Sequence, residues 1–216
     1  MTVYRLDERI IFPLPELGEE DGLLAVGGDL SIERLVLAYE NGIFPWYSDD
    51  EPILWWCPKR RFIIKPKNMK TSKSMRRVLN KKDFEVTFNK NFEGVITNCK
   101  ELRENKEGTW ITAEMKEAYI NLFNKGFGFS VEVTKNGELV GGVYGVRLGK
   151  CFFGESMFSK VPNGSKIALI YLGKKLEEEG ALFIDCQFHT KHLESMGGEY
   201  IEWEEFKKLL SEGIEY

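Results

Sequence analysis

Apolar residues recur at helical spacing in some stretches of this chain and at strand spacing in others. The clearest early helix is predicted between Ser31, a suitable N-cap, and Gly42, which suits the position just after a helix. A stripe of apolar residues connects the two: Leu35, Val36 and Tyr39. The segment before it, GLLAVGGDL, is rich in glycine and is interpreted as a turn.

From residue 61 onward the pattern predicts strands and helices in alternation. The predicted strands are 61–65, the first part of 84–102, three strands within 129–158 with an Asn136-Gly137 hairpin between the first two, and the start of 181–193. The predicted helices are about ten residues from Ser72, the second part of 84–102, then 109–126, 163–180 with Asn163 as a capping candidate, and 202–213. This alternation favours a mixed sheet with helices on its faces. A domain boundary near residues 60–68 is suggested by Pro58, Pro66 and the start of a basic stretch.

Two of the predicted strands carry acids among apolar residues. Strand alternation in CFFGESMF places Phe153, Glu155 and Met157 on one face. In ALFIDCQFHTKHL, Asp185 and Gln187 are two residues apart, so a strand would point both the same way. Each acid has a structural explanation, namely an edge strand or a strand end that reaches water. The alternative is a hydrogen-bonded polar site beside an apolar pocket, because a buried carboxylate is costly unless it is paired.

Composition is compatible with a globular chain of one large domain or two small ones. The chain has 216 residues, of which 43% are hydrophobic. The sequence shows no long apolar run typical of a transmembrane helix or a signal peptide, so we expect a cytoplasmic protein. The four cysteines are widely spread and form no C-x-x-C pair, which indicates reduced thiols.

The net charge of −4 conceals an uneven distribution. Residues 59–82 contain eleven Lys or Arg and no acid, whereas the rest of the chain has 19 basic and 34 acidic residues. A basic stretch of this kind is either a solvated face or a surface for a polyanion such as nucleic acid, which would relieve the repulsion between its charges.

Three further features of the sequence are weaker signals of function. Cys186, His189 and His192 are spaced by three, but no further ligand pair is evident, so neither a metal site nor a thiol catalyst is favoured. GGVYGVRLG does not match a nucleotide-binding fingerprint. Ser165 begins a predicted helix, where backbone N–H groups either bind a phosphate or are simply capped.

Eight blocks in sequence resemble the leucyl/phenylalanyl-tRNA–protein transferases of bacteria. They are GLLAVGGDLS, AYENGIFPWYS, PILWWCPKRR, TWIT, LVGGVYGV, FFGESMFS, NGSK and IDCQ, and they extend over nearly the whole chain. The resemblance implies an α+β fold with two parts: a small N-terminal α/β domain (1–62) and a GNAT-like (acyl-CoA N-acyltransferase-type) domain (63–216) whose mixed sheet is flanked by helices. It implies transfer of Leu or Phe, less readily Met, from aminoacyl-tRNA to the α-amino group of N-terminal Arg or Lys. The product would be an N-degron for protein degradation.

The resemblance also assigns candidate site residues. Asp185 and Gln187 match the family's D-C-Q motif as the pair that orients and activates the incoming amine, and Glu155 matches its G-E-S-M glutamate. The implied pocket for the Leu or Phe side chain consists of Trp46, Trp110, Val143, Met157, Leu172, Leu176 and Ile184. The implied tRNA contacts are Tyr39 and Tyr119 at the terminal adenosine, and Lys73, Arg76, Arg77, Lys81 and Lys82 on the acceptor stem.

The implied partners are aminoacyl-tRNA and acceptor proteins, with no cofactor, metal, membrane or DNA. Val143 stands where the family often has Met, which leaves the amino-acid preference open. Two other functions compete with this interpretation. An acyl-CoA-dependent acetyltransferase would need a pyrophosphate-binding loop that KVPNGSK does not supply, and a tRNA-binding protein without catalysis would leave Glu155, Asp185 and Gln187 unexplained.

Overall fold

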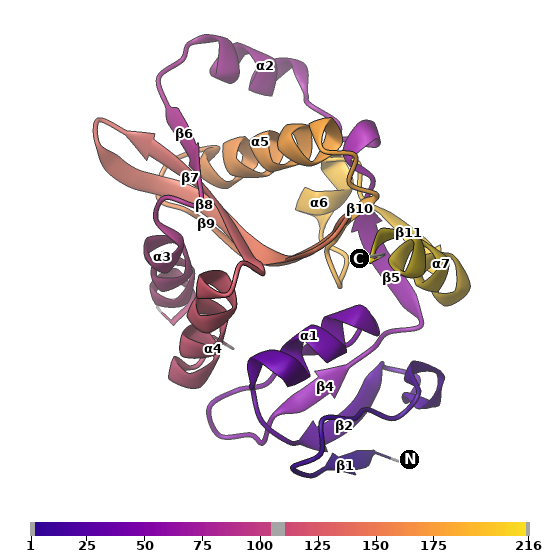
Figure 1. Ribbon diagram of the computed structural model, residues 1–216. Helices are drawn as coiled ribbons and strands as arrows, with labels where there is room; N and C mark the ends of the chain where they lie inside the picture. The colour runs from indigo at the N-terminus through magenta and orange to yellow at the C-terminus, as the bar shows by residue number, and fades with distance from the viewer. Residues whose placement is uncertain (1–2, 105–110, 215–216) are drawn as a thin grey trace.

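The fold contains two mixed β-sheets, as described by a computed structural model of residues 3–104 and 111–214 (Figure 1). The smaller sheet has the strand order β1-β2-β4-β3, with β1 and β2 parallel and the other pairs antiparallel. Its strands are β1 (Tyr4–Leu6), β2 (Leu23–Gly27), β3 (Phe44–Pro45) and β4 (Leu54–Trp56). Helix α1 (Ile32–Glu40) connects β2 to β3, and Ser31 caps it by accepting a hydrogen bond from the Arg34 N–H.

The larger sheet has the order β11-β5-β10-β9-β8-β7-β6. Its strands are β5 (Arg60–Ile64), β6 (Glu85–Phe88), β7 (Gly128–Lys135), β8 (Glu138–Leu148), β9 (Cys151–Ser159), β10 (Phe183–Asp185) and β11 (Glu199–Glu202). Only β9 and β10 pair in parallel within this sheet, among the residues that the structure describes. The predicted α+β class with a mixed sheet flanked by helices is confirmed.

Helices cover both faces of the larger sheet (Figure 1). On one face α3 (Phe92–Glu104) and α4 (Ala113–Asn124) share a buried core with the small sheet and α1, and on the other face α5 (Gly164–Glu178) packs in a second core. The remaining helices are α2 (Lys73–Asn80), α6 (Lys191–Ser195), α7 (Trp203–Gly213) and the 3-10 turns η1 (Pro15–Leu17) and η2 (Pro66–Asn68).

Several sequence predictions of local structure differ from the fold. The glycine-rich segment interpreted as a turn contains β2, and both α6 and β11 lie between β10 and the C-terminal helix, where none was predicted. Asn163 occupies the position before α5 in a left-handed conformation (φ 72°) but makes no capping hydrogen bond with its side chain. Instead, Ser159 Oγ accepts the Ser165 N–H at 3.2 Å, so the Ser165 amide is capped rather than free.

The predicted domain boundary between residues 62 and 63 falls inside strand β5. This strand pairs with both β10 and β11 of the larger sheet, and Ile63 belongs to the core that also contains α1 and the small sheet. Division into two domains therefore stays a prediction. For the site, the important consequence is that β5, which follows the small sheet in the chain, pairs directly with the strand that carries Asp185.

Candidate active site

The candidate site lies where the parallel strands β9 and β10 separate. Their ladder pairs Phe183 with Cys151 and ends where Asp185 is opposite Phe153. Strand β9 continues to Ser159, whereas the chain beyond Asp185 turns away. A cavity of about 570 Å³ lies beside this separation. The residues that line it come from β3 and the residue after it, from α3, β8, β9, α5 and β10, and from the segment after β10.

A β-bulge in β9 directs Glu155 into the site. Tyr144 is opposite Ser156 and Gly145 is opposite Gly154, so Glu155 is an extra residue with no partner across the ladder. A bulge of this kind reverses the alternation of side chains on either side of it. The prediction that Phe153, Glu155 and Met157 share a face is therefore wrong: Phe153 belongs to the core with α3 and α4, and Met157 packs in the core with α5.

The signal for this bulge was present in the sequence as two glycines. Gly145 and Gly154 face each other next to the bulge, and a Cβ built on Gly145 would lie 2.1 Å from the Phe153 carbonyl oxygen. Isolated glycines inside strands mark bulges and close backbone approaches.

Glu155 is buried and makes three side-chain hydrogen bonds. Its Oε1 accepts from the Tyr39 hydroxyl at 2.8 Å and from Gln187 Nε2 at 3.0 Å, and its Oε2 lies 2.9 Å from the Tyr119 hydroxyl oxygen. Burial raises the pKa of Glu155 to about 7, although the hydrogen bonds with the two tyrosines lower it.

Gln187 is held in a strained backbone conformation at the edge of the cavity. Its φ is 61°, and the Phe188 N–H donates to the Cys186 carbonyl at 2.6 Å, which closes a three-residue turn around it. The Gln187 N–H donates to Asp185 Oδ1 at 2.9 Å. Strain of this kind costs about 1–3 kcal/mol and persists where surrounding contacts fix it. Here those contacts are the Asp185 carboxylate and Glu155.

Asp185 is fully buried in an ion pair with Arg61. Arg61 Nε lies 2.9 and 3.0 Å from the two carboxylate oxygens, and Arg61 Nη2 donates to the Gly42 carbonyl at 2.6 Å. The guanidinium lies between the rings of Phe44 and Phe206, 4.8 and 4.7 Å from their centroids. Asp185 is not among the side chains that line the cavity. The expectation that Asp185 and Gln187 extend side by side from a strand is wrong, because β10 ends at Asp185.

Arg61 was missed as a site residue because it belongs to the basic stretch. It is completely buried, whereas its neighbour Arg60 is exposed and paired with Glu202 on the surface. The available signal was that three apolar residues, Phe62, Ile63 and Ile64, follow Arg61 in the same strand and cover both of its faces, as in a strand at the centre of a sheet.

Most of the predicted apolar pocket lines the cavity. Trp46, Val143, Met157, Leu172 and Ile184 are lining residues, whereas Leu176 is buried in the α5 core and is not one of them. The prediction for Trp110 lies outside the described residues. Sequence reasoning did not assign the other lining residues to the pocket: Phe44, Pro45, Arg103, Gly154, Ser156, Leu169, Cys186, Phe188, Thr190, His192 and Leu193.

Tyr39 and Tyr119 do not have the role expected from the sequence. Both are fully buried, so neither offers a ring face for stacking on an adenosine, and burial raises the pKa of each well above its ordinary value. Their hydroxyl oxygens lie 2.5 Å apart and both contact Glu155. The two residues come from α1 and α4, so the cluster around Glu155 connects the helix beside the small sheet to the larger sheet.

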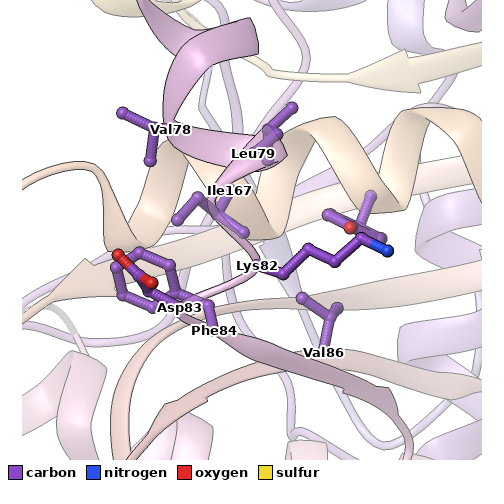
Figure 2. A pocket seen from close by; sticks show the side chains of 8 residues that line it. Val78, Leu79, Lys82, Asp83, Phe84, Val86 and Ile167 are labelled. Carbon is purple, nitrogen blue, oxygen red and sulfur yellow. The ribbon is translucent and has the colours of Figure 1, made fainter.

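Five exposed cations, in α2 and in the two residues after it, form what we call the α2 surface, in contrast to the buried Arg61. Lys73, Arg76, Arg77, Lys81 and Lys82 make no ion pair with an acid of residues 3–104 or 111–214. Lys82 borders a second cavity of about 240 Å³ where α2, β6 and α5 meet, and Figure 2 shows Val78, Leu79, Phe84 and Ile167 around it. The basic helix and the Glu155 cavity therefore both contact α5.

Metal and thiol chemistry receive no support from the described part of the chain. No group of three or more His, Cys, Asp or Glu in it is arranged to bind a metal ion. Burial raises the pKa of the Cys186 thiol, which disfavours the thiolate. None of the described helices is long and apolar enough to cross a bilayer.

The site combines two features of the fold. It lies at the point where two parallel strands of a mixed, helix-covered sheet separate, and it places a polar cluster beside an apolar cavity. One solved structure found by comparison, a GCN5-related N-acetyltransferase-like protein from Streptococcus suis, is a distant likeness. It has a TM-score of 0.38 and 13% identity, and the match covers 82% of this chain and 67% of that one.

Sequence comparison specifies the family. A model described as leucyl/phenylalanyl-tRNA protein transferase matches residues 63–211, and a model of its N-terminal domain matches residues 28–59. The chain is 51% identical to a leucyl/phenylalanyl-tRNA–protein transferase of Syntrophus aciditrophicus, over 99% of this chain and 90% of the relative. It is also 51% identical to one of Flavobacterium johnsoniae, over 96% and 99%. The chain belongs to the leucyl/phenylalanyl-tRNA–protein transferase family, and the resemblance stated from its sequence blocks is confirmed.

Proposed function

We propose that this enzyme transfers Leu or Phe, and less readily Met, from aminoacyl-tRNA to the α-amino group of an N-terminal Arg or Lys. The product would mark the acceptor protein for degradation, and the reaction would take place in the cytoplasm. The names of relatives that are 51% identical over nearly the whole chain support the donor and the protein acceptor. The single observation that carries the proposal is an apolar cavity that places Glu155 and Gln187 beside a lining fit for a Leu or Phe side chain.

The aminoacyl side chain would occupy the apolar part of this cavity. Val143, Met157 and Leu172 offer aliphatic surface, and Trp46 and Phe188 contribute aromatic rings whose centroids are 5.3 Å apart. A hydrophobic pocket discriminates by about 1–3 kcal/mol for each methylene. Acceptance of Leu, Phe and Met together therefore suits such a pocket, and branching at the β-carbon would be rejected by shape.

The reaction needs positioning more than activation, since the ester to the tRNA ribose is already an activated acyl donor. The amine nitrogen attacks the ester carbon, the C–O bond to the ribose breaks, and the proton lost by the amine replaces the acyl group on the ribose oxygen. Gln187 donates its amide N–H to Glu155, which leaves the amide oxygen available to accept a hydrogen bond from the incoming amine. We assign Asp185 to positioning, since it supports the Gln187 backbone from outside the cavity.

The tRNA would be held by the exposed cations of the α2 surface. Lys73, Arg76, Arg77, Lys81 and Lys82 would contact backbone phosphates, and such contacts carry little base information. This suits an enzyme that accepts several tRNAs, and it predicts affinity that falls steeply with salt.

A transfer assay tests the proposal against both competing functions. The purified chain is incubated with labelled Leu-tRNA, Phe-tRNA or Met-tRNA and with peptides that begin with Arg, Lys or Ala. Label should appear on the Arg and Lys peptides, most with Leu and Phe. Labelling by acetyl-CoA instead would identify an acetyltransferase, and tRNA binding without transfer would identify a binding protein.

A further inference from the structure

The hydrogen bonds around Glu155 form a closed ring. The ring has three oxygen–oxygen contacts: Tyr39 Oη to Tyr119 Oη at 2.5 Å, Tyr39 Oη to Glu155 Oε1 at 2.8 Å, and Tyr119 Oη to Glu155 Oε2 at 2.9 Å. Tyr39 and Tyr119 are at most 1% exposed and Glu155 is 7% exposed, so the ring lies in the interior beside the cavity. Each contact between two oxygens requires one proton to be a hydrogen bond.

Counting protons determines the charge of Glu155 in this arrangement. The two tyrosine hydroxyls supply two protons for three contacts. If Glu155 were ionised, one of the three contacts would contain no proton. With both hydroxyls donating to the carboxylate, that contact is the one between Tyr39 and Tyr119, where lone pairs would face each other at 2.5 Å. A carboxylic acid supplies the third proton, and every contact is then satisfied.

The position of the acid proton follows from Gln187. Its Nε2 donates to Glu155 Oε1 at 3.0 Å, and the Tyr39 hydroxyl donates to the same oxygen, so Oε1 acts as an acceptor in both contacts. The proton is therefore on Oε2 and is donated to Tyr119. Tyr119 in turn donates to Tyr39, and Tyr39 donates to Oε1, so all donors point the same way around the ring.

The surrounding charges favour the same state. Asp185 on β10 raises the pKa of Glu155, and the guanidinium of Arg61 on β5 is engaged with Asp185. On the α3 side, Arg103 lines the cavity and its Nε donates to Ser156 Oγ at 3.2 Å. Tyr144 on β8 is buried, and its pKa is well above the ordinary value because of burial. Within the described residues, no cation forms an ion pair with Glu155.

We propose that Glu155 is a neutral carboxylic acid in the resting enzyme, and that Tyr39 and Tyr119 are positioning residues that keep its proton in a closed ring. Neutral Glu155 anchors the amide of Gln187 without placing a negative charge at the cavity. It therefore does not serve as a counter-ion for the Arg or Lys side chain of the acceptor. Its effect on transfer rests on the proposed function, but its protonation state does not.

Carboxyl-labelled glutamate makes the protonation state directly measurable. Carbon-13 NMR of the labelled chain is recorded across pH, and Glu155→Gln identifies the Glu155 signal by its loss. We expect this signal to titrate well above about 4.3, the ordinary pKa of glutamate, while exposed glutamates titrate near it. An infrared spectrum of the unsubstituted chain near pH 6 should contain a protonated carboxyl band, and this second measurement needs no variant.

Three tyrosine variants distinguish the effect of losing a hydrogen bond of the ring from the effect of losing any buried hydroxyl. Tyr39→Phe and Tyr119→Phe each remove a ring hydroxyl and should lower transfer at saturating substrate by about tenfold, the effect of one buried hydrogen bond left unmade. Tyr144→Phe is the matched control. It removes a buried hydroxyl that has no hydrogen-bond partner in the described chain, and transfer should change less than about twofold.

The pH profile gives a further readout of positioning. The transfer rate of the unsubstituted enzyme should fall with rising pH as Glu155 ionises. The rate of Glu155→Gln should not show this fall, because its amide remains a hydrogen-bond donor at every pH. A Glu155 signal that titrates near the ordinary value would overturn the proposal even if transfer were normal. If the enzyme transfers no amino acid but the Glu155 signal titrates well above the ordinary pKa of glutamate, the proposed ring stands. That result counts against the proposed function alone.

Discussion

Arg61 and Arg76 belong to one basic stretch of sequence, yet they occupy opposite environments. Arg61 is buried, pairs with both oxygens of Asp185 and lies between two aromatic rings. Arg76 lies on an exposed helix and has no ion-pair partner in the part of the chain that the structure describes. Burial makes a charge depend on its partner, because an unpaired ion in the interior is costly, whereas water solvates an exposed ion.

This contrast extends to the whole of the two regions. At the site, Asp185 is matched by Arg61, and Glu155 is surrounded by hydroxyl and amide donors. On α2 the cations repel one another and nothing in residues 3–104 or 111–214 neutralises them by an ion pair. We therefore expect substitutions at the site to change stability and turnover, and substitutions on α2 to change partner binding with little effect on stability.

The largest effect is expected from breaking the Arg61–Asp185 pair. Arg61→Met leaves a buried carboxylate without its cation and should lower the free energy of unfolding by about 3–5 kcal/mol. Urea denaturation measures this as a lower midpoint with an unchanged slope.

Arg60→Met is the matched control for that experiment. The Arg60–Glu202 pair is exposed on both sides, so its loss should change the free energy of unfolding by less than about 1 kcal/mol. Adding Asp185→Leu to Arg61→Met should recover much of the lost stability, since no charge then remains buried. Equal losses for Arg60→Met and Arg61→Met would contradict the assignment of Arg61 to the interior.

The sequence predicted the regular elements better than it predicted the site. Ser31 caps a helix where it was expected to, a helix begins beside Ser72 as predicted, and Asn136-Gly137 forms its hairpin with positive φ at both residues. These features depend on neighbours in sequence. The chemistry of the site depends on two departures from regular structure, the bulge at Glu155 and the turn at Gln187.

Both departures defeat reasoning that relies on strand alternation. Alternation gives the face of a side chain only while the ladder continues, and each departure interrupts it at the residue of interest. The partners of these residues come from far along the chain: Tyr39 from α1, Tyr119 from α4 and Arg61 from β5. Such contacts are tertiary, so only their residue types, and not their pairing, were visible in the sequence.

The second prediction concerns the pH dependence of stability. The pKa of Glu155 is raised from 4.5 to about 7 in the folded chain. Protonated Glu155 therefore favours the folded state, fully below about pH 4.5, and this contribution is lost as pH rises to about 7. Relative to Glu155→Gln, the unsubstituted chain should lose roughly 3 kcal/mol across this window. Denaturation at several pH values measures the difference, and parallel curves would contradict a raised pKa.

The third prediction separates turnover from stability at Gln187. Gln187→Ala removes the amide that lies between Glu155 and the cavity, and turnover at saturating substrate should fall about 100-fold, as for other groups that act in the transition state. The free energy of unfolding should fall by about 1 kcal/mol, from one lost hydrogen bond. Gln187→Asn is the control for backbone strain, because Asn tolerates a positive φ better than Ala does. Single-turnover kinetics together with tRNA binding make the measurement, and a change in tRNA affinity alone would contradict the assignment.

Substitutions on the α2 surface should have the smallest effect on stability and the clearest effect on tRNA binding. Replacing Arg76, Arg77, Lys81 and Lys82 by Gln should change the free energy of unfolding by less than about 1 kcal/mol, because these exposed residues have no ion-pair partner within the described chain. Affinity for tRNA should fall, and the slope of log affinity against log salt should lose about 3 units, since each phosphate contact contributes somewhat less than one. A matched control replaces four cations that already have acidic partners: Arg60, Lys175, Lys207 and Lys208. Their loss should leave the slope nearly unchanged, and equal slopes for the two quadruple variants would show that net charge, rather than the α2 surface, attracts the tRNA.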